Sequence, residues 1–286
     1  MKAFDDRLIR LQISLNDTGE TFVYDQNYFI SASGTKYVNG NFADFAIRID
    51  NINKTTRDLL INRTSLWAKN KTVANISLEV GRQSYGTFQI AAGQSIACTP
   101  TQPPDIGLIF KSLSQVGAMG LIGAYSAAPI TTLKVIAQQI ATSNSLTLDY
   151  QASQNPTIGN YHFTGAAPVQ VKKLQELGYI NAYIDDTSKS LVVTDNGVAR
   201  AVPPIDVNPQ TGMVGVPQLT EIGARAVQLI KNEVKIGAPV NLQSQINPGV
   251  NGKYLIAKLG FDVASWQTPF YWIMDLRIPL STGSPQ

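Results

Sequence analysis

The sequence predicts a mainly β fold in which two small β-barrel domains flank a small α+β domain. Polar and apolar residues alternate through much of the first 110 residues and again through about the last 80, whereas amphipathic helices are predicted only between these regions. Repeated short strands separated by turn residues are typical of sandwiches and barrels. We therefore predict a β domain over residues 1–129, an α+β domain over 130–204 and a second β domain over 205–286.

Alternation with a period of two marks the strands of the amino-terminal domain. In Arg7–Leu15 the residues from Leu11 to Leu15 alternate between apolar and polar, as expected of a strand with one buried face. The segment Asn16–Gly19 has the composition of a turn, and Thr55–Ile61 is predicted to be a short helix capped by Thr55 or Thr56. The other predicted strands are Glu20–Tyr24, Phe42–Asp50, Val73–Val80, Tyr85–Ile90 and Gly107–Phe110.

Helical periodicity defines the middle domain. The segment Thr131–Ala141 follows a proline and places Leu133, Ile136, Ala137 and Ile140 on one face of a helix. A second amphipathic helix is predicted over Pro168–Leu177, because proline suits a first turn and Gly178 suits a helix end. The remaining predicted elements are a strand over Leu146–Tyr150 and a hairpin formed by Tyr179–Ile184, a turn at Asp185–Lys189 and Ser190–Thr194.

Strand patterns return after a stiff linker, Ala201–Pro204. Four or five strands in about 80 residues suit a small antiparallel barrel. The two β domains share no sequence repeat that can be aligned. The predicted extended segments are Thr211–Pro217, Ala224–Ile230, Val240–Ser244, Gly252–Leu259 and Phe270–Ile278.

Composition excludes several classes of protein. Of the 286 residues 44% are hydrophobic and only 15% are charged, which excludes a disordered polyelectrolyte and a Glu/Lys-rich coiled coil. The net charge of +3 comes without clustered Lys and Arg, which argues against a nucleic-acid-binding face. Cys98 is the single cysteine, so no internal disulfide forms and a reducing compartment is indicated. No targeting segment or membrane span is predicted, because the most apolar window, Val116–Ile130, is too short and is broken by glycines.

Residues that would carry chemistry are scarce. His162 is the only histidine and has no Ser or Cys motif beside it, so we assign it a structural role. One Cys and one His cannot form a zinc site, and Gly117–Gly123 lacks both the spacing of a dinucleotide loop and a surrounding βαβ unit. The least ordinary acids are Asp262 and Asp275, which lie near tryptophans. We predict no cofactor, no metal and no catalysis.

The carboxy-terminal third carries a recognisable motif. A Gly-Met-Val-Gly-Val-Pro turn opens it, strands over Gly223–Leu229 and Ile236–Leu242 follow, and Gly252–Leu259 begins a closing hairpin. This arrangement resembles the last domain of baseplate hub proteins from contractile-tailed bacteriophages. That family often has His-x-x-Asp near the hairpin tip, and this chain keeps an acid there but not the histidine. The residues that carry the resemblance are Gly212, Met213, Gly215, Pro217, Gly237 and Asp262.

The resemblance implies a mechanical role. Such hubs are trimeric rings in which two tail-tube-like β domains per chain stand in for six tube subunits, and they join a six-fold tail tube to a three-fold central spike. It implies a homotrimer in the virion tail baseplate, made in the bacterial host cytoplasm, with the tail tube protein, the spike and other baseplate proteins as partners. DNA would pass through the lumen during genome ejection without sequence-specific binding.

Two further functions stay open from the residues. The first is a tail-associated cell-wall hydrolase, for which Asp262 and His162 are the candidates. The second is a carbohydrate-binding tail module, in which Trp266, Tyr271 and Trp272 would stack on sugars. Because the strand pattern continues through these aromatic residues, core packing is the stronger interpretation of them.

Overall fold

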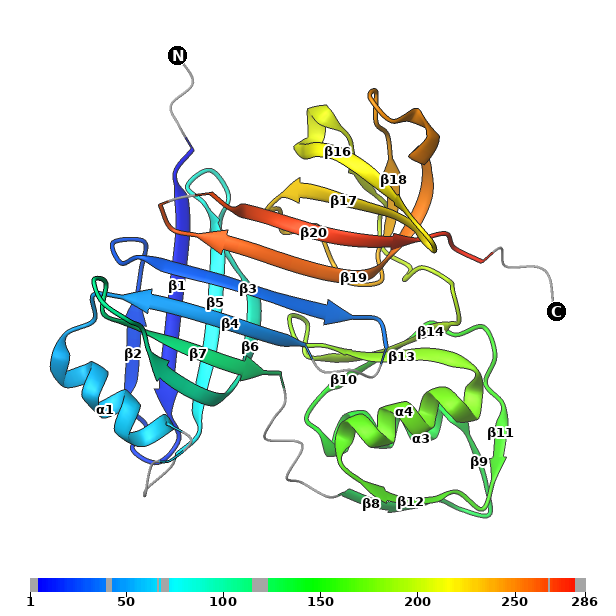
Figure 1. Ribbon diagram of the computed structural model, residues 1–286. Coiled ribbons are helices and arrows are strands. Elements are labelled where there is room, and N and C mark those ends of the chain that lie inside the picture. The colour runs from blue at the N-terminus through cyan, green and yellow to red at the C-terminus, as the bar shows by residue number, and fades with distance from the viewer. Residues whose placement is uncertain are drawn as a thin grey trace.

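The computed structural model describes residues 5–39, 43–65, 67, 72–114, 123–266 and 268–280. Figure 1 shows three parts: an amino-terminal set of strands, a carboxy-terminal set beside it, and a helix-containing insert below the second set. The mainly β class with an α+β insert is confirmed. Closure of each sheet into a barrel and the domain limits at residues 129 and 204 stay predictions. Phe42 and most of Gly117–Gly123 lie outside the described residues.

The amino-terminal sheet has the strand order β3-β4-β7-β6-β5-β1-β2 and is antiparallel throughout. The alternation predicted for β1 is present, with Ile9, Leu11, Ile13 and Leu15 buried on one face. Its elements are β1 (Arg7–Leu15), β2 (Thr21–Tyr24), β3 (Ile30–Tyr37), β4 (Asp44–Asp50), α1 (Lys54–Thr64), β5 (Ala74–Arg82), β6 (Gly86–Pro100) and β7 (Gly107–Leu113).

Two details of this sheet differ from the sequence prediction. Strand β3 was not predicted, because its sequence is rich in small polar residues and lacks apolar alternation. The cap of α1 is Asn53, whose Oδ1 accepts a hydrogen bond from the Thr56 N–H at 2.8 Å, so neither Thr55 nor Thr56 is the cap. Asparagine is as good a cap as serine and starts the helix earlier than predicted.

The carboxy-terminal sheet is built from β15 to β20. It has the order β16-β17-β20-β19, and β18 and then β15 continue from the first part of β19. Its elements are β15 (Ile205–Val207), the 3₁₀ turn η1 (Pro209–Thr211), β16 (Met213–Thr220), β17 (Gly223–Leu229), β18 (Pro239–Leu242), the 3₁₀ turn η2 (Pro248–Val250), β19 (Gly252–Ala264) and β20 (Phe270–Arg277).

The two sheets share one topology. Reading β3-β4-β7-β6-β5-β1 against β16-β17-β20-β19-β18-β15 matches six strands of each sheet in both spatial order and chain order, and β2 alone has no counterpart among the described residues. Even a bulge is shared, because β6 carries an extra residue between Ser95 and Ala97 and β19 carries one between Ile256 and Lys258. One pairing differs in direction: β1 is antiparallel to β5, whereas β15 is parallel to β18.

The two sheets are joined edge to edge within the chain. The second part of β19 pairs antiparallel with β3, from Lys258 opposite Tyr37 to Ala264 opposite Ser31, and this junction creates a continuous 13-stranded sheet. Figure 1 shows the two strands side by side across the front of the molecule. One hydrophobic core underlies both sheets, with Phe110 and Trp272 among its largest fully buried side chains.

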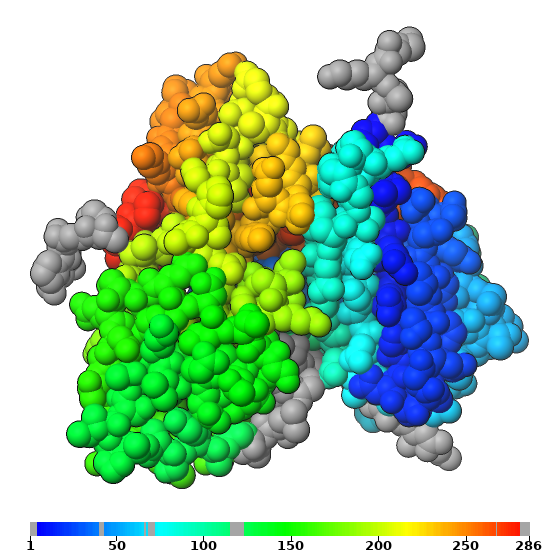
Figure 2. All heavy atoms as spheres, turned by 180° about the vertical axis from the view of Figure 1, so that it is seen from behind, coloured from blue at the N-terminus to red at the C-terminus, as the bar shows by residue number. Residues whose placement is uncertain are grey.

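The insert lies between the two sheets in sequence and forms a lobe of its own when seen from behind (Figure 2). Its two helices and its hairpin enclose a separate core that includes Leu133, Ile136, Ile140 and Leu174. Its elements are β8 (Gly123–Ser126), β9 (Ile130–Thr132), α3 (Leu133–Ser143), β10 (Thr147–Tyr150), β11 (Thr157–Gly159), β12 (His162–Gly165), α4 (Ala167–Gly178), β13 (Ile180–Asp185) and β14 (Ser190–Asp195).

The helix predictions for the insert differ from the structure only at the ends. Pro168 does lie in the first turn of α4, but the residue with left-handed backbone that ends it is Tyr179 (φ 50°), not Gly178. In the part of the chain that is described, no helix is long and apolar enough to cross a membrane.

Candidate functional site

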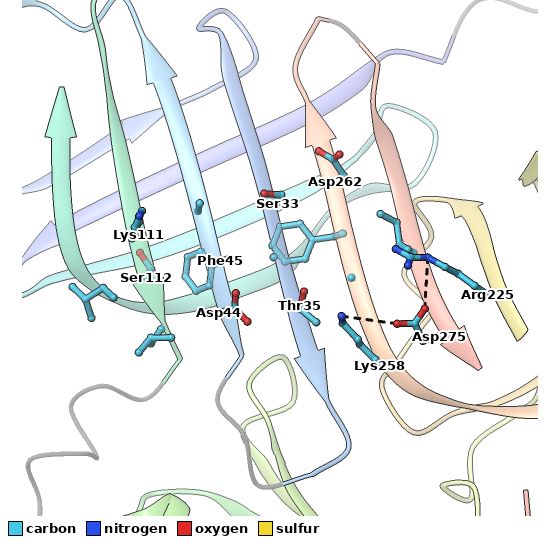
Figure 3. Close-up of a pocket in the computed structure, with 17 residues that line it drawn as sticks. Ser33, Thr35, Asp44, Phe45, Lys111, Ser112, Arg225, Lys258, Asp262 and Asp275 are labelled. Carbon is cyan, nitrogen blue, oxygen red and sulfur yellow. Dashed lines mark ion pairs between the residues drawn. The ribbon is translucent and has the colours of Figure 1, made fainter. Parts of the chain in front are cut away.

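A shallow groove of about 510 Å³ crosses the junction between the two sheets (Figure 3). Its walls come from β4 and β7 on one side and from β17 and β20 on the other, with β3 and β19 between them. We call this surface the junction groove. Its charged residues are Asp44, Lys111, Arg225, Lys258, Asp262 and Asp275.

Strand alternation explains the polar character of the junction groove. Residues that face the core, such as Phe261, alternate with residues that face outward, such as Ser33 and Asp262. Gly34 permits the close approach of the two sheets, because a Cβ atom there would lie 2.6 Å from both the Phe261 ring and the Phe45 Cβ. The core side of the junction is therefore tightly packed, while its outer side stays polar.

The charges in the junction groove balance one another. Asp275 lies 3.6 Å from the Arg225 Nε and 3.9 Å from the Lys258 Nζ, and Figure 3 shows both contacts. With Asp44, Asp262 and Lys111, the groove holds three carboxylates and three cations. Such a surface presents no strong field of either sign to a charged polymer.

Asp262 is a partly buried acid of the groove. Burial raises the pKa of its carboxyl above the usual value, and it makes no hydrogen bond or ion pair with any described residue. His162, its suggested catalytic partner, lies exposed at the start of β12 in the insert, on a different part of the molecule. Over the described ranges, no group of three or more His, Cys, Asp and Glu side chains gathers as a metal site would require.

The three aromatic residues proposed for sugar binding do not form one surface. Trp272 is buried and its indole N–H donates to the Lys231 carbonyl at 3.0 Å, so it belongs to the core. Trp266 is exposed at the β19–β20 turn and donates to the Gln26 carbonyl, whereas Tyr271 is half-buried on β20. Trp266, Tyr271 and Trp272 therefore do not form a common surface on which a sugar could stack.

The structure separates the motif residues into three places. Gly212 (φ 95°), Met213, Gly215 (φ 70°) and the buried Pro217 lie at the start and along the irregular part of β16, an edge strand. Asp262 lies apart from them in the junction groove. The third glycine of the motif, Gly237, is in the β17–β18 connection, where the carboxy-terminal sheet meets the insert.

Gly237 joins the carboxy-terminal sheet to the insert and to the linker that follows it. Its φ is 77°, its N–H donates to the Ile256 carbonyl at 3.0 Å, and its own carbonyl accepts from the Arg200 N–H at 2.8 Å. A Cβ atom at this position would lie 2.2 Å from the Tyr183 hydroxyl oxygen. Only glycine suits both the backbone conformation and the space.

A buried network of charges surrounds this contact. The Arg200 guanidinium donates through Nε and Nη2 to Asp149 Oδ2 at 3.0 and 2.8 Å, and through Nη1 to Asp185 Oδ2 at 3.0 Å. The buried Lys36 of β3 donates to Thr187 Oγ1, two residues beyond Asp185. The network therefore ties the linker after β14 to the insert hairpin and to the amino-terminal sheet.

We expect this network to make the free energy of unfolding depend on pH in the acidic range. Burial opposes ionisation of Asp185, but the Lys36 charge and hydrogen bonds from Ser188 and Arg200 outweigh it, so the pKa of Asp185 is lowered. A carboxyl whose pKa is lower in the folded state than in the unfolded state stabilises the fold when the pH is above the unfolded-state pKa, about 4. This stabilisation is lost as the pH falls from there through the folded-state pKa. The free energy of unfolding of the Asp185→Asn variant should therefore lie well below wild type at pH 7 and approach it near pH 3. Denaturant titrations at both pH values measure this. The same difference between variant and wild type at pH 7 and pH 3 would contradict the lowered pKa of Asp185.

Sequence reasoning did not find this network. Its members lie between positions 36 and 200, and each acid has the appearance of an ordinary turn or strand residue. The signal that the sequence offered was the pair of acids, Asp185 and Asp186, at the start of the Asp185–Lys189 turn.

A comparison with protein-family models identifies one family. The family model described as baseplate hub gp41 matches residues 8–276. A search of curated proteins gave no match. Among solved structures, the prophage MuSo2 43 kDa tail protein from Shewanella oneidensis aligns with a TM-score of 0.62 at 9% identity, over 94% of this chain and 97% of that one.

Two further solved structures show the same fold. The tail protein from Neisseria meningitidis MC58 aligns with a TM-score of 0.61 at 10% identity, over 93% of this chain and 96% of that one. The E. coli c3393 protein, a type VI secretion component similar to the T4 tail proteins gp27 and gp5, gives 0.55 at 10% identity, over 94% and 77%. The match to the family model over nearly the whole chain shows that this protein belongs to the baseplate hub gp41 family of phage tail structural proteins.

Proposed function

We propose that three copies of this chain form the ring that joins a six-fold tail tube to a three-fold central spike in a contractile tail. The observation that carries the proposal is the shared topology of the two sheets, down to the bulges in β6 and β19. Two equivalent units in one chain, joined edge to edge, repeat the relation between neighbouring subunits of a ring. Three such chains present six equivalent units to the tube and three identical copies to the spike.

The junction groove faces the channel in this proposal. Its outward residues are mainly polar or charged, and its three carboxylates balance its three cations. DNA is a dense polyanion that binds clustered Lys and Arg and is held by them. A polar, charge-balanced wall lets DNA move along it without sequence-specific contacts and without retention, as genome ejection requires.

The proposed role is non-catalytic and needs no cofactor. Among the described residues that line the groove with Asp262 there is no histidine, and His162 lies on the insert. The tube protein, the spike and other baseplate proteins are the proposed partners, and the virion tail, after synthesis in the host cytoplasm, is the proposed location.

A mass measurement tests the ring. Native mass spectrometry of the purified chain, at micromolar concentration, should give a species of three times the 31.0 kDa of one chain. Quantification of the protein in purified particles should give three copies per tail. A chain that stays monomeric under both conditions, or that assembles as a hexamer, would contradict the proposed stoichiometry.

A further inference from the structure

We infer that neighbouring copies join by pairing the end of β6 in one copy with β16 in the next, in the same register in which β19 pairs with β3 inside each chain. This inference rests on the proposed ring and adds to it the two strands that form the contact, their direction and their residue pairs. It follows from the shared topology together with the two strand edges that the fold leaves open.

The equivalence of the two sheets identifies the edges. Strand β16 corresponds to β3, and β6 corresponds to β19, by both spatial and chain order. Within the chain, the outer edge of β3 is filled by β19. In the described part of the chain, β16 pairs only with β17, and β6 beyond Gln94 pairs only with β7. The unpaired edges of β16 and of the end of β6 therefore correspond to the two strands, β3 and β19, that pair with each other inside the chain.

The register follows from the shared ladders. The bulges align Ala97 with Lys258, so that Thr99 corresponds to Gly260 and Thr101 to Asp262. The β3–β4 and β16–β17 hairpins give the other half of the register. Thr35 lies opposite Asp44, and Thr220 lies opposite Gly223, which is the equivalent of Asp44, so Thr220 corresponds to Thr35. The internal pairs Gly260–Thr35 and Asp262–Ser33 then translate into Thr99 opposite Thr220 and Thr101 opposite Gln218.

Exposed apolar side chains on β16 support this contact. Leu219 is 68% exposed and Val216 is 45% exposed, which is unusual for a strand whose neighbour β17 is largely buried. In the derived register, Leu219 lies opposite Pro100. The equivalent internal pair is Gly34 opposite Phe261, where the aromatic ring packs tightly over the glycine. Both junctions thus place apolar atoms on the core side and polar side chains on the groove side.

Two prolines limit the extent of the contact. Proline lacks an N–H, and prolines protect an edge strand against unspecific pairing. In the derived register Pro100 faces Leu219 at a bonded position, so the Pro100 carbonyl can accept from the Leu219 N–H but one hydrogen bond of that pair is missing. The Pro217 carbonyl already accepts from the Asn247 Nδ2 at 3.0 Å, so the contact ends before Pro217.

Disulfide cross-linking tests the contact. Hydrogen bonds from the Val38 N–H to the Ala257 carbonyl and from the Ser265 N–H to the Ile30 carbonyl mark the bonded pairs of the internal junction. Pairs alternate along an antiparallel ladder, so Thr35–Gly260, and with it Thr99–Thr220, is a non-bonded pair with a Cα separation of about 4.5 Å, which a disulfide spans. The native Cys98 is buried, and burial raises the pKa of its thiol to about 11, so it stays a neutral, unreactive thiol.

The Thr99→Cys/Thr220→Cys double variant should oxidise to covalent trimers on non-reducing gels, and the single variants should remain uncross-linked. A matched control is Val23→Cys/Thr220→Cys, which tests the edge strand β2 at the other end of the sheet and should give no cross-link. Leu219→Asp should abolish the trimer in native mass spectrometry while its circular dichroism spectrum stays unchanged, because Leu219 is exposed in the single chain.

The outcomes separate this inference from the ring itself. A trimer by mass that cross-links through Val23 and not through Thr99, or that survives Leu219→Asp, overturns the β6–β16 contact and leaves the ring proposal standing. A chain that is monomeric by mass overturns the ring proposal and the contact with it.

Discussion

Replacing Arg200 by alanine is expected to lower the free energy of unfolding by about 3–5 kcal/mol, as for the loss of one partner from other buried ion pairs. Its side chain is only 9% exposed and its guanidinium contacts the carboxylates of both Asp149 and Asp185. Removal leaves the buried Asp185 carboxylate with one cationic neighbour fewer. Chemical denaturation of the full chain at pH 7, followed by circular dichroism, measures the change.

A matched control is Arg225→Ala in the junction groove. Arg225 also pairs with an aspartate, Asp275, at 3.6 Å, but its side chain is 51% exposed. Ion pairs that water can reach contribute roughly 0–1 kcal/mol. If the two alanine variants lose the same stability, the Arg200 network does not hold the three parts together as described.

Replacing Gly237 by alanine is expected to cost on the order of 3 kcal/mol, the sum of a left-handed backbone penalty and a steric overlap. The φ of 77° disfavours any residue with a Cβ atom, and that atom would lie 2.2 Å from the Tyr183 hydroxyl oxygen. Tyr183 has little room to move, because it is buried and its hydroxyl donates to the Ile236 carbonyl. Thermal unfolding of the variant, with wild type at the same protein concentration, gives the effect.

Gly215→Ala provides the comparison for the backbone part alone. Gly215 has a similar φ of 70°, but a Cβ atom there meets nothing within 4 Å. We expect a loss of about 1–2 kcal/mol for this variant. Adding Tyr183→Phe to Gly237→Ala should recover part of the loss, because the overlap is with the hydroxyl oxygen. If Gly237→Ala and Gly215→Ala lower the free energy of unfolding equally, the overlap with the Tyr183 hydroxyl costs nothing and the expectation is wrong.

The sequence predicted those strands in which large apolar residues occupy every second position. Strands β1, β4 and β5 follow this pattern because each has one face in the core. Strand β3 escaped prediction because it is paired on both edges and Gly34 lies under the Phe261 ring, so small side chains are required. The end of β6 was missed because the bulge at Ile96 interrupts its alternation.

The shared topology was invisible in the sequence because equivalent positions carry unlike residues. Lys111 on β7 corresponds to Asp275 on β20, and Gly34 on β3 corresponds to Leu219 on β16. Backbone pairing and the location of bulges are conserved between the sheets, whereas the side chains have adapted to different neighbours. The family resemblance was correct, and it rested in part on Gly212, Gly215 and Gly237, where backbone conformation restricts the residue type.

The β3–β19 junction also bears on how readily a ring would assemble. Two sheets on one chain meet at an effective concentration set by the length of the intervening chain, not by how much protein the cell has made. In a closed ring of three chains, half of the contacts between sheets thus form as each chain folds and are independent of dilution. Only the remaining contacts require encounters between molecules, so assembly needs fewer collisions than a ring of six separate subunits.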